Sequence, residues 1–196
     1  MQINLLWTGI QYHSLENCIV DVLNTDTEIN STIIGSYEGK IYLVEYCIKT
    51  NKDWQTYFVE LKYRHSNKEV QLILKKEKDN WLLNNTKANE FKDCFDVDIS
   101  LSPFTNSLPV NRLKLSNNQE QKIKVIYINI LEQELKPVEQ VYKRLSKTKY
   151  LYQNVPNDFE AEIEVDESGF VVSYPSLFKR RSVLKTFYTG FQISPL

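Results

Sequence analysis

The chain contains few of the residues that break secondary structure, form disulfides or commonly act in catalysis. Its 196 residues include five glycines, six prolines, three cysteines and two histidines. Cys18, Cys47 and Cys94 are odd in number and widely spaced, so neither a disulfide framework nor a zinc site is indicated, and we expect free thiols. The GxGxxG, P-loop, GxSxG and HExxH motifs are also missing. We therefore predict no cofactor, no metal and no catalytic residue.

An excess of charge of one sign and long hydrophobic runs are missing too. The 24 basic and 25 acidic residues leave a net charge of -1, which argues against a basic face for nucleic acid. Apolar stretches such as residues 41–48 fall short of the roughly 20 residues of a membrane span, so we expect no transmembrane segment. The N-terminus lacks the basic segment and apolar run of a signal peptide, which predicts a cytoplasmic protein. The oligomeric state stays open.

The residues that are abundant favour β-structure. The composition, 42% hydrophobic and 25% charged, is that of a globular protein, and its 12 tyrosines, nine phenylalanines and three tryptophans suit strands. Residues 29–37 and 40–49 flank Glu38-Gly39, and residues 159–165 and 170–174 flank residues 166–169, so each pair predicts a hairpin. No repeat or linker indicates a domain boundary. We predict one all-β domain.

Further strands are expected from alternation of apolar and polar residues. They span residues 54–64, 69–75, 81–83, 95–101 and 122–130. In the first of them the set Gln55, Tyr57, Val59, Leu61 and Tyr63 should face the core. Residues 138–145 fit an amphipathic helix as well as a strand, and residues 84–92 fit a single helical turn.

One part of the sequence is similar to a known family. Residues 93–113 read DCFDVDISLSPFTNSLPVNRL and are followed by Tyr142-Lys143-Arg144-Leu145 and by a closing Val-Asp, Gly, Val, Tyr-Pro, Phe, Arg pattern within residues 159–180. This resembles the putative glycolipid-binding family of bacterial proteins, whose core pattern matches Cys94, Asp96, Asp98, Ser102-Pro103, Thr105-Asn106, Leu108-Pro109 and Arg112. Asn111 departs from the pattern, since a second Arg is expected there. Trp7 and Glu16-Asn17-Cys18 fit its N-terminal half.

The resemblance implies a fold and a function. It implies a large antiparallel sheet curled around a ligand-sized interior, or an incomplete barrel with few short helices, similar to the carriers that bear lipoproteins between bacterial membranes. It covers residues 5–181, so we expect a single β domain over residues 1–181 and a C-terminal tail over 182–196. A lipid or glycolipid is the implied ligand. The candidate ligand-binding residues are Asp96, Asp98, Thr105, Asn106, Arg112, Tyr142, Arg144 and Tyr174.

The two aspartates of the pattern allow opposite interpretations. Two residues apart on a strand, they leave the same face with β-carbons about 7 Å apart, opposite Phe95, Val97, Ile99 and Leu101. If the apolar face forms the core, the aspartates are solvated. If they line a cavity, they need partners such as Arg112 or Arg144 and offer an anchor for sugar hydroxyls or a cation.

The other polar groups of the pattern are equally open to two interpretations. Residues 102–109 read as a rigid polar turn that carries Thr105 and Asn106, which either bind a ligand or satisfy the turn's own backbone. Arg112 can hold a carboxylate or phosphate of a ligand, or one of the aspartates. The tyrosines are strand formers, some of which suit a cavity with apolar and polar parts.

Three hypotheses of function follow. The favoured one is a β-protein that holds a lipid or glycolipid, with the headgroup at Asp96, Asp98, Asn106 and Arg112. The second is a hydrolase or isomerase of a sugar or lipid that uses Asp96 and Asp98 as acid and base. The third is a structural or interaction protein in which Arg112 pairs with the aspartates and no cavity exists. The side of strand 95–101 that faces the concave interior discriminates between them.

Overall fold

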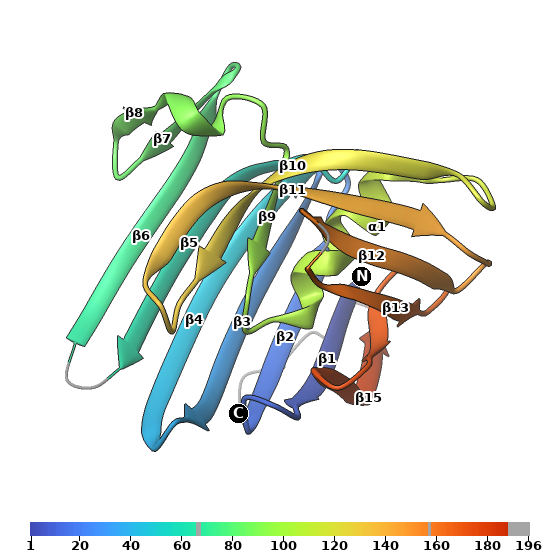
Figure 1. The fold of residues 1–196 in the computed structure, drawn as a ribbon, viewed down its shortest axis with the longest axis horizontal. Helices are drawn as coiled ribbons and strands as arrows, with labels where there is room; N and C mark the ends of the chain where they lie inside the picture. The colour runs from blue at the N-terminus through green and yellow to red at the C-terminus, as the bar shows by residue number, and fades with distance from the viewer. Residues whose placement is uncertain (66–67, 157, 188–196) are drawn as a thin grey trace, which may run out of the picture.

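A single sheet of 15 strands makes up most of the computed structural model, which describes residues 1–65, 68–156 and 158–187 (Figure 1). Its first half is a continuous meander in which each strand pairs with the next along the chain. These strands are β1 (Gln2–Gly9), β2 (Ser14–Val22), β3 (Asp26–Tyr37), β4 (Lys40–Asn51), β5 (Thr56–His65), β6 (Lys68–Glu77), β7 (Asn80–Leu83) and β8 (Thr86–Ala88).

The second half of the chain adds seven strands to the other side of β1. They are β9 (Asp96–Ile99), β10 (Glu120–Asn129), β11 (Glu134–Arg144), β12 (Lys149–Val155), β13 (Glu160–Val165), β14 (Val171–Tyr174) and β15 (Phe178–Thr186). The two halves are joined by the antiparallel pairing of β1 with β15, which we call the β1–β15 seam. The sheet is not closed, because β8 and β9 are its two edge strands. The pairing of β9 with β10 is parallel, whereas every other pairing in the described residues is antiparallel.

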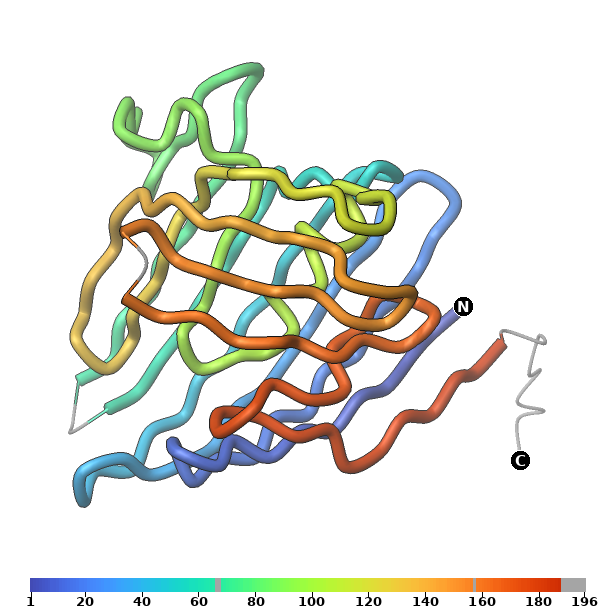
Figure 2. Tube along the Cα trace, turned by 45° about the vertical axis from the view of Figure 1, so that its right-hand side comes forward, coloured from blue at the N-terminus to red at the C-terminus, as the bar shows by residue number. Residues whose placement is uncertain are grey.

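The sheet curls so that its two halves face each other. Figures 1 and 2 show β10–β13 in front of β1–β5, with β9 and two of the three short helices, η2 and α1, between them, while η1 lies beside β7 and β8. The helices are η1 (Asn89–Phe91), η2 (Pro103–Asn106) and α1 (Ser107–Leu113). The predicted all-β, curled and unclosed sheet is therefore confirmed, and the segment of the family pattern lies in its interior.

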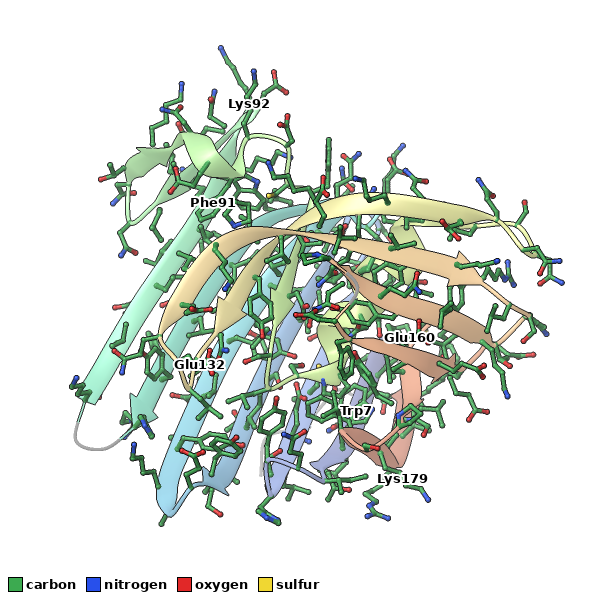
Figure 3. All side chains as sticks on the ribbon, in the orientation of Figure 1. Trp7, Phe91, Lys92, Glu132, Glu160 and Lys179 are labelled. Atoms are coloured by element: carbon green, nitrogen blue, oxygen red, sulfur yellow. The ribbon has the colours of Figure 1, made fainter. Side chains whose placement is uncertain are left out.

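Apolar residues of this inner segment fill the space between the two walls. Val97, Ile99 and Phe104 are fully buried and pack with strands β1–β5, while Val110 packs beneath β10–β15. Trp7 lies in the same interior in Figure 3, in contrast to Lys92 and Lys179, which project outward. Burial of apolar surface on both sides of one segment therefore joins the two halves of the sheet.

Local turn chemistry explains why the predicted hairpins formed. Glu38 and Gly39 both have positive φ, 49° and 75°, as a tight turn between twisted strands requires. The hairpin of β13 and β14 is confirmed as well, and Gly169 has a φ of 75°.

In β5 a bulge opposite Lys49 and Thr50 changes the alternation of buried and exposed residues at the start of the strand. Gln55 is exposed there, and its neighbour Thr56 is buried instead.

Tertiary pairing settled the ambiguous segments. Residues 138–144 belong to β11, which pairs with β10 on one side and with β12 on the other. The predicted helical turn within residues 84–92 is η1.

The prediction of a polar turn at residues 102–109 is wrong, because η2 and α1 occupy this segment and most of it is buried. Ser102 caps η2 by accepting a hydrogen bond from the Phe104 N–H, and Pro103 follows as the first residue, a common helix start.

Neither of the two interpretations of strand 95–101 holds for all of its residues. Phe95, which lies in the core in the first interpretation, is 44% exposed and packs under the ammonium of Lys76. Asp96, on the face expected to be solvated in one interpretation, is 0% exposed. Both faces of β9 are covered because the strand lies between the two walls of the sheet. The strand therefore carries polar side chains into the interior.

The predicted tail 182–196 falls partly on β15, which pairs with β1 through Thr186, and partly outside the described residues. Among the residues that the structure describes, no helix has the length and apolar character needed to cross a bilayer.

Candidate functional site

A cavity of about 760 Å³ lies between the inner segment and the second half of the sheet. Its lining comes from the β1–β2 turn, β9, the residues around η2, and β10–β12 together with residues of the β12–β13 and β14–β15 turns. Three of the predicted site residues line it: Asp98, Asn106 and Tyr174. The strand face that carries Asp98 therefore points toward the cavity.

Asp98 is held by two neighbours at the bottom of the cavity. Its Oδ1 accepts a hydrogen bond from Thr105 Oγ1 at 3.2 Å, and its Oδ2 accepts one from Gln140 Nε2 at 2.6 Å. Burial raises the pKa of Asp98, while the bonds from Gln140 and Thr105 act in the opposite direction. Each carboxylate oxygen keeps acceptor capacity beyond its one partner.

Asn106 and Tyr142 form a second buried polar pair. The Tyr142 hydroxyl donates to Asn106 Oδ1 at 2.8 Å, and both residues are at most 5% exposed. Asn106 lines the cavity, whereas Tyr142 lies behind it. We refer to Asp98, Ser100, Asn106 and Gln140, which come from β9, its C-terminal end, η2 and β11, as the polar floor.

Ser100 provides an open hydrogen-bonding group in this polar floor. Its Oγ is buried and has no hydrogen-bond partner among the described residues, although its backbone N–H donates to the Ile128 carbonyl. Buried hydroxyls are ordinarily paired, because leaving one unpaired costs free energy. An unpaired hydroxyl at a cavity wall is what a ligand or water would satisfy.

Aromatic rings make up much of the rest of the cavity lining. They are Tyr12, Tyr127, Tyr152, Phe159, Tyr174 and Phe178, which we call the aromatic wall. Tyr174 is at its centre, with ring centroids 6.1 Å from Tyr152, 6.2 Å from Phe159 and 6.1 Å from Phe178. Burial raises the pKa of the Tyr174 hydroxyl, and the nearby Tyr152 and Asp98 raise it further, so it stays a neutral hydrogen-bonding group.

The remaining predicted residues lie outside the cavity lining. Arg112 Nε contacts both carboxylate oxygens of Asp96 at 3.0 and 3.1 Å, and Nη2 contacts Oδ2. Burial raises the pKa of Asp96, and Arg112 opposes the shift. Arg144 donates to the backbone carbonyls of Leu115, Ser146 and Lys147. The pair of aspartates is thus divided, with Asp96 paired to Arg112 and Asp98 facing the cavity.

Sequence reasoning missed several residues of this region, including Ser100 in the polar floor, Gln140 and Glu16. Gln140 lies on the segment whose structure was ambiguous, so its direction was unknown. Glu16, noted as part of the family resemblance, is 2% exposed and accepts hydrogen bonds from Ser31, Tyr46 and Ser102. The sequence did offer an indication: Glu16 alternates with Ser14, Cys18 and Val20 on one face of a strand, and a charged residue is unexpected on a face that is otherwise uncharged.

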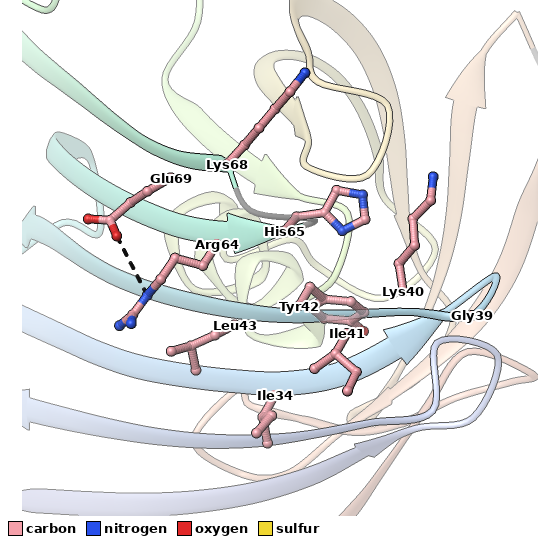
Figure 4. A pocket seen from close by; sticks show the side chains of 10 residues that line it. All are labelled: Ile34, Gly39, Lys40, Ile41, Tyr42, Leu43, Arg64, His65, Lys68 and Glu69. Carbon is pink, nitrogen blue, oxygen red and sulfur yellow. Dashed lines mark ion pairs between the residues drawn. The ribbon is translucent and has the colours of Figure 1, made fainter.

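A second hollow of about 660 Å³ lies at the rim of β3–β6 (Figure 4). Ile41 is 74% exposed there, and Arg64 faces Glu69 at 3.9 Å. It contains none of the predicted site residues. Within the described ranges, no group of three or more His, Cys, Asp or Glu side chains is placed to hold a metal ion. The cavity with the polar floor is therefore the candidate site.

Comparison with known proteins agrees with the fold and the residue pattern. The crystal structure of a DUF1089 family protein from Pseudomonas aeruginosa is similar, with a TM-score of 0.75 and 28% identity over 85% of this chain and 92% of that chain. Among curated proteins, none matches. A family model described as putative glycolipid-binding matches residues 4–180, which include both walls of the sheet and the cavity. The chain therefore belongs to the putative glycolipid-binding family.

Proposed function

We propose that the protein binds a small amphipathic molecule, an uncharged sugar headgroup attached to a hydrocarbon chain, in the cavity of the curled sheet. The observation that carries the proposal is that the polar floor and the aromatic wall line one and the same cavity. A volume of about 760 Å³ lies within the range of roughly 300–1,000 Å³ that small-molecule sites occupy. The family description supports a binding role in general.

The polar floor has the chemistry that recognises neighbouring hydroxyl groups. Asp98 offers acceptors, Asn106 offers an amide, and Ser100 offers an unpaired hydroxyl. Because Thr105, Gln140 and Tyr142 hold these side chains in place, little conformational freedom is lost on binding. In this proposal Asp98 and Asn106 contact the headgroup, while Thr105 and Tyr142 support them. The Asp96–Arg112 pair fixes the strand and helix beneath.

The aromatic wall suits the rest of such a ligand. The rings of Phe159, Tyr174 and Phe178 offer apolar surface for a hydrocarbon chain or for the C–H face of a sugar, and the tyrosine hydroxyl adds a polar tip. Small-molecule sites typically combine such apolar walls with a few polar groups that fix orientation.

The charges around the cavity favour an uncharged headgroup over an anionic one. Lys136 is the one basic side chain among the described lining residues, and its ammonium pairs with Glu134 at 2.7 Å. Asp98, Glu139 and Asp158 are acidic lining residues. An anionic phosphate or carboxylate would meet net negative charge without a free cation to offset it.

Isothermal titration calorimetry with octyl β-D-glucoside below its critical micelle concentration tests the proposal. We expect binding that is tighter than that of octanoate, which has an anionic head, or of free glucose. Asp98→Ala should weaken binding about tenfold or more, the loss expected for hydrogen bonds to a charged group. Tyr174→Ala should weaken it as well.

Glu69→Ala is the matched control, because it removes a carboxylate from the second hollow. It should leave the affinity unchanged. Equal affinity for octyl glucoside and octanoate, or a loss in the control as large as in Asp98→Ala, would overturn the proposal. Thermal unfolding of each variant verifies that the fold is retained.

A further inference from the structure

Glu16 is a carboxylate buried in the interior of the sheet without a cationic partner. It lies on β2, and its Oε1 accepts hydrogen bonds from Ser31 at 2.8 Å, Tyr46 at 2.7 Å and Ser102 at 2.8 Å. Its Oε2 is buried and has no hydrogen-bond partner in the described part of the chain. No ion pair to Glu16 occurs among these residues.

Ser102 connects this carboxylate to the helix that carries part of the polar floor. Its Oγ donates to Glu16 and accepts the Phe104 N–H at 3.2 Å, which makes Ser102 the N-cap of η2. Two residues of that short helix then reach the site: Thr105 donates to Asp98, and Asn106 lines the cavity. A continuous set of hydrogen bonds therefore runs from β2 to the cavity.

We propose that Glu16 is a positioning residue for the ligand site, which acts through Ser102 on η2, and that the affinity of the cavity depends on whether Glu16 is ionised. This inference rests on the proposed binding function and adds its regulation. Glu16 does not line the cavity, so it acts by fixing the helix that carries the polar floor.

Glu16 changes its charge in the neutral range. Burial raises its pKa to about 7, while the hydroxyls of Tyr46, Ser102 and Ser31 oppose the shift. The titratable neighbours are Cys18 on β2 and Tyr42 and Tyr46 on β4. Burial is the main cause of raised pKa values for all three, to about 12 for Tyr42 and well above the ordinary values for Cys18 and Tyr46. These neighbours stay protonated while Glu16 titrates.

The direction of the effect follows from the donors around Oε1. An ionised carboxylate accepts charge-assisted hydrogen bonds, which are shorter and stronger than those to a neutral acid. In a protonated Glu16, an O–H at Oε2 has no acceptor among the described residues, and an O–H at Oε1 displaces one of the three hydroxyls that donate to that oxygen. The ionised form therefore holds Ser102 and η2 more firmly, and ligand affinity should rise as the pH increases through about 7.

Titration of octyl β-D-glucoside at pH 6 and pH 8 measures this dependence. We expect the wild type to bind about fivefold more tightly at pH 8, the order of one strengthened hydrogen bond. Glu16→Gln keeps an acceptor oxygen without the charge, so its affinity should match the wild type at pH 6 and should show little change with pH. An unchanged pH dependence in Glu16→Gln would overturn the inference.

Ser102→Ala and Ser31→Ala form a matched pair. Each removes one hydroxyl that donates to Glu16 Oε1 at 2.8 Å, but only Ser102 leads to η2. We expect Ser102→Ala to weaken binding and to abolish the pH dependence, and Ser31→Ala to retain both affinity and pH dependence. Because Ser102 also lines the cavity, the double variant with Glu16→Gln is needed. Additive losses would mean that Ser102 acts directly on the ligand, and would contradict the inference.

A readout without ligand separates this inference from the binding proposal. The backbone amide signals of Thr105 and Asn106, followed by nuclear magnetic resonance from pH 5 to 9, should shift with a midpoint near the pKa of Glu16. The shift should be absent in Glu16→Gln. If octyl glucoside fails to bind while these signals titrate, the binding proposal fails and the positioning role stands. If they do not titrate, the positioning role itself is refuted.

Discussion

Arg112 neutralises a carboxylate that is completely buried. Asp96 is 0% exposed, and the guanidinium contacts both of its oxygens. Removal of one member of a buried pair leaves an uncompensated charge and costs about 3–5 kcal/mol. We expect Arg112→Ala to lower the free energy of unfolding by that amount, as measured by urea denaturation.

Lys122→Ala is the control for this prediction. Lys122 pairs with Glu139 at 3.0 Å, but both side chains are about half exposed. Exposed pairs contribute about 0–1 kcal/mol, so the control should change stability little. Equal losses in the two variants would show that Asp96 is not the source of the cost.

Glu16 should make the protein less stable as the pH rises. The folded pKa is about 7, and the reference value is 4.5, so the folded state binds more protons between these values. The stabilisation is complete below pH 4.5 and is lost as the pH approaches 7, a difference of roughly 3 kcal/mol. Urea denaturation of the wild type and Glu16→Gln from pH 4.5 to 8 measures it.

Asp96 and Asp98 also have raised pKa values and change the stability with pH in the same direction. The contribution of Glu16 is therefore the difference in pH dependence of the free energy of unfolding between the wild type and Glu16→Gln. The stability of Glu16→Gln should therefore fall less steeply with pH. Parallel curves for the two proteins would contradict the assignment.

At the scale of single elements, two glycines with the same φ have different surroundings. Gly39 and Gly169 both have a φ of 75°, in the turns of the β3–β4 and β13–β14 hairpins. A Cβ at Gly39 would meet nothing within 4 Å, whereas one at Gly169 would lie 2.6 Å from Asn111 of α1. We expect Gly39→Ala to cost about 1 kcal/mol from backbone strain and Gly169→Ala to cost clearly more.

Thermal unfolding of both alanine variants checks this comparison. A larger loss for Gly169→Ala would show that the β13–β14 hairpin packs against α1 as described. A loss equal to that of Gly39→Ala would mean that Asn111 moves aside at no cost.

The elements that the sequence predicted well are those with local causes. The turn at Glu38-Gly39 favours its hairpin by backbone geometry alone. The strand at residues 138–144 depends on its pairing with β10 and β12, which no local pattern reveals. The helix α1 was missed because it has seven residues and contains Pro109. Proline is tolerated there because the first N–H groups of a helix have no intrahelical partner.

Part of the cavity lining was predicted for the same reason. The family pattern and the alternation around β9 brought attention to Asp98, Asn106 and Tyr174, which line one cavity. They did not separate Asp98 from Asp96, because residues two apart on a strand are equivalent until their partners are known. Those partners, Gln140 and Arg112, come from elements distant in sequence.

At the scale of the whole molecule, the β1–β15 seam and the inner segment join the two halves of the sheet. Trp7 Nε1 donates to the Val171 carbonyl at 2.9 Å, which adds a side-chain link across 164 residues. Since neither half buries its inner face alone, we expect one cooperative unfolding transition.

Tryptophan fluorescence and far-ultraviolet circular dichroism test this expectation. All three tryptophans precede residue 82, so fluorescence reports on the first half, whereas circular dichroism reports on every strand. The two urea curves should coincide. Separated midpoints would mean that the halves unfold independently.

The position of the aromatic wall along the chain has a consequence for biosynthesis. Tyr12 lies near the start, while Tyr174 and Phe178 lie near the end of the described residues. A ribosome that has not yet released residue 178 therefore holds a chain with an open cavity and a β1 that is paired with β2 but not yet with β15. Any ligand of this cavity must be acquired after translation of β14 and β15, as a late event in the life of the chain.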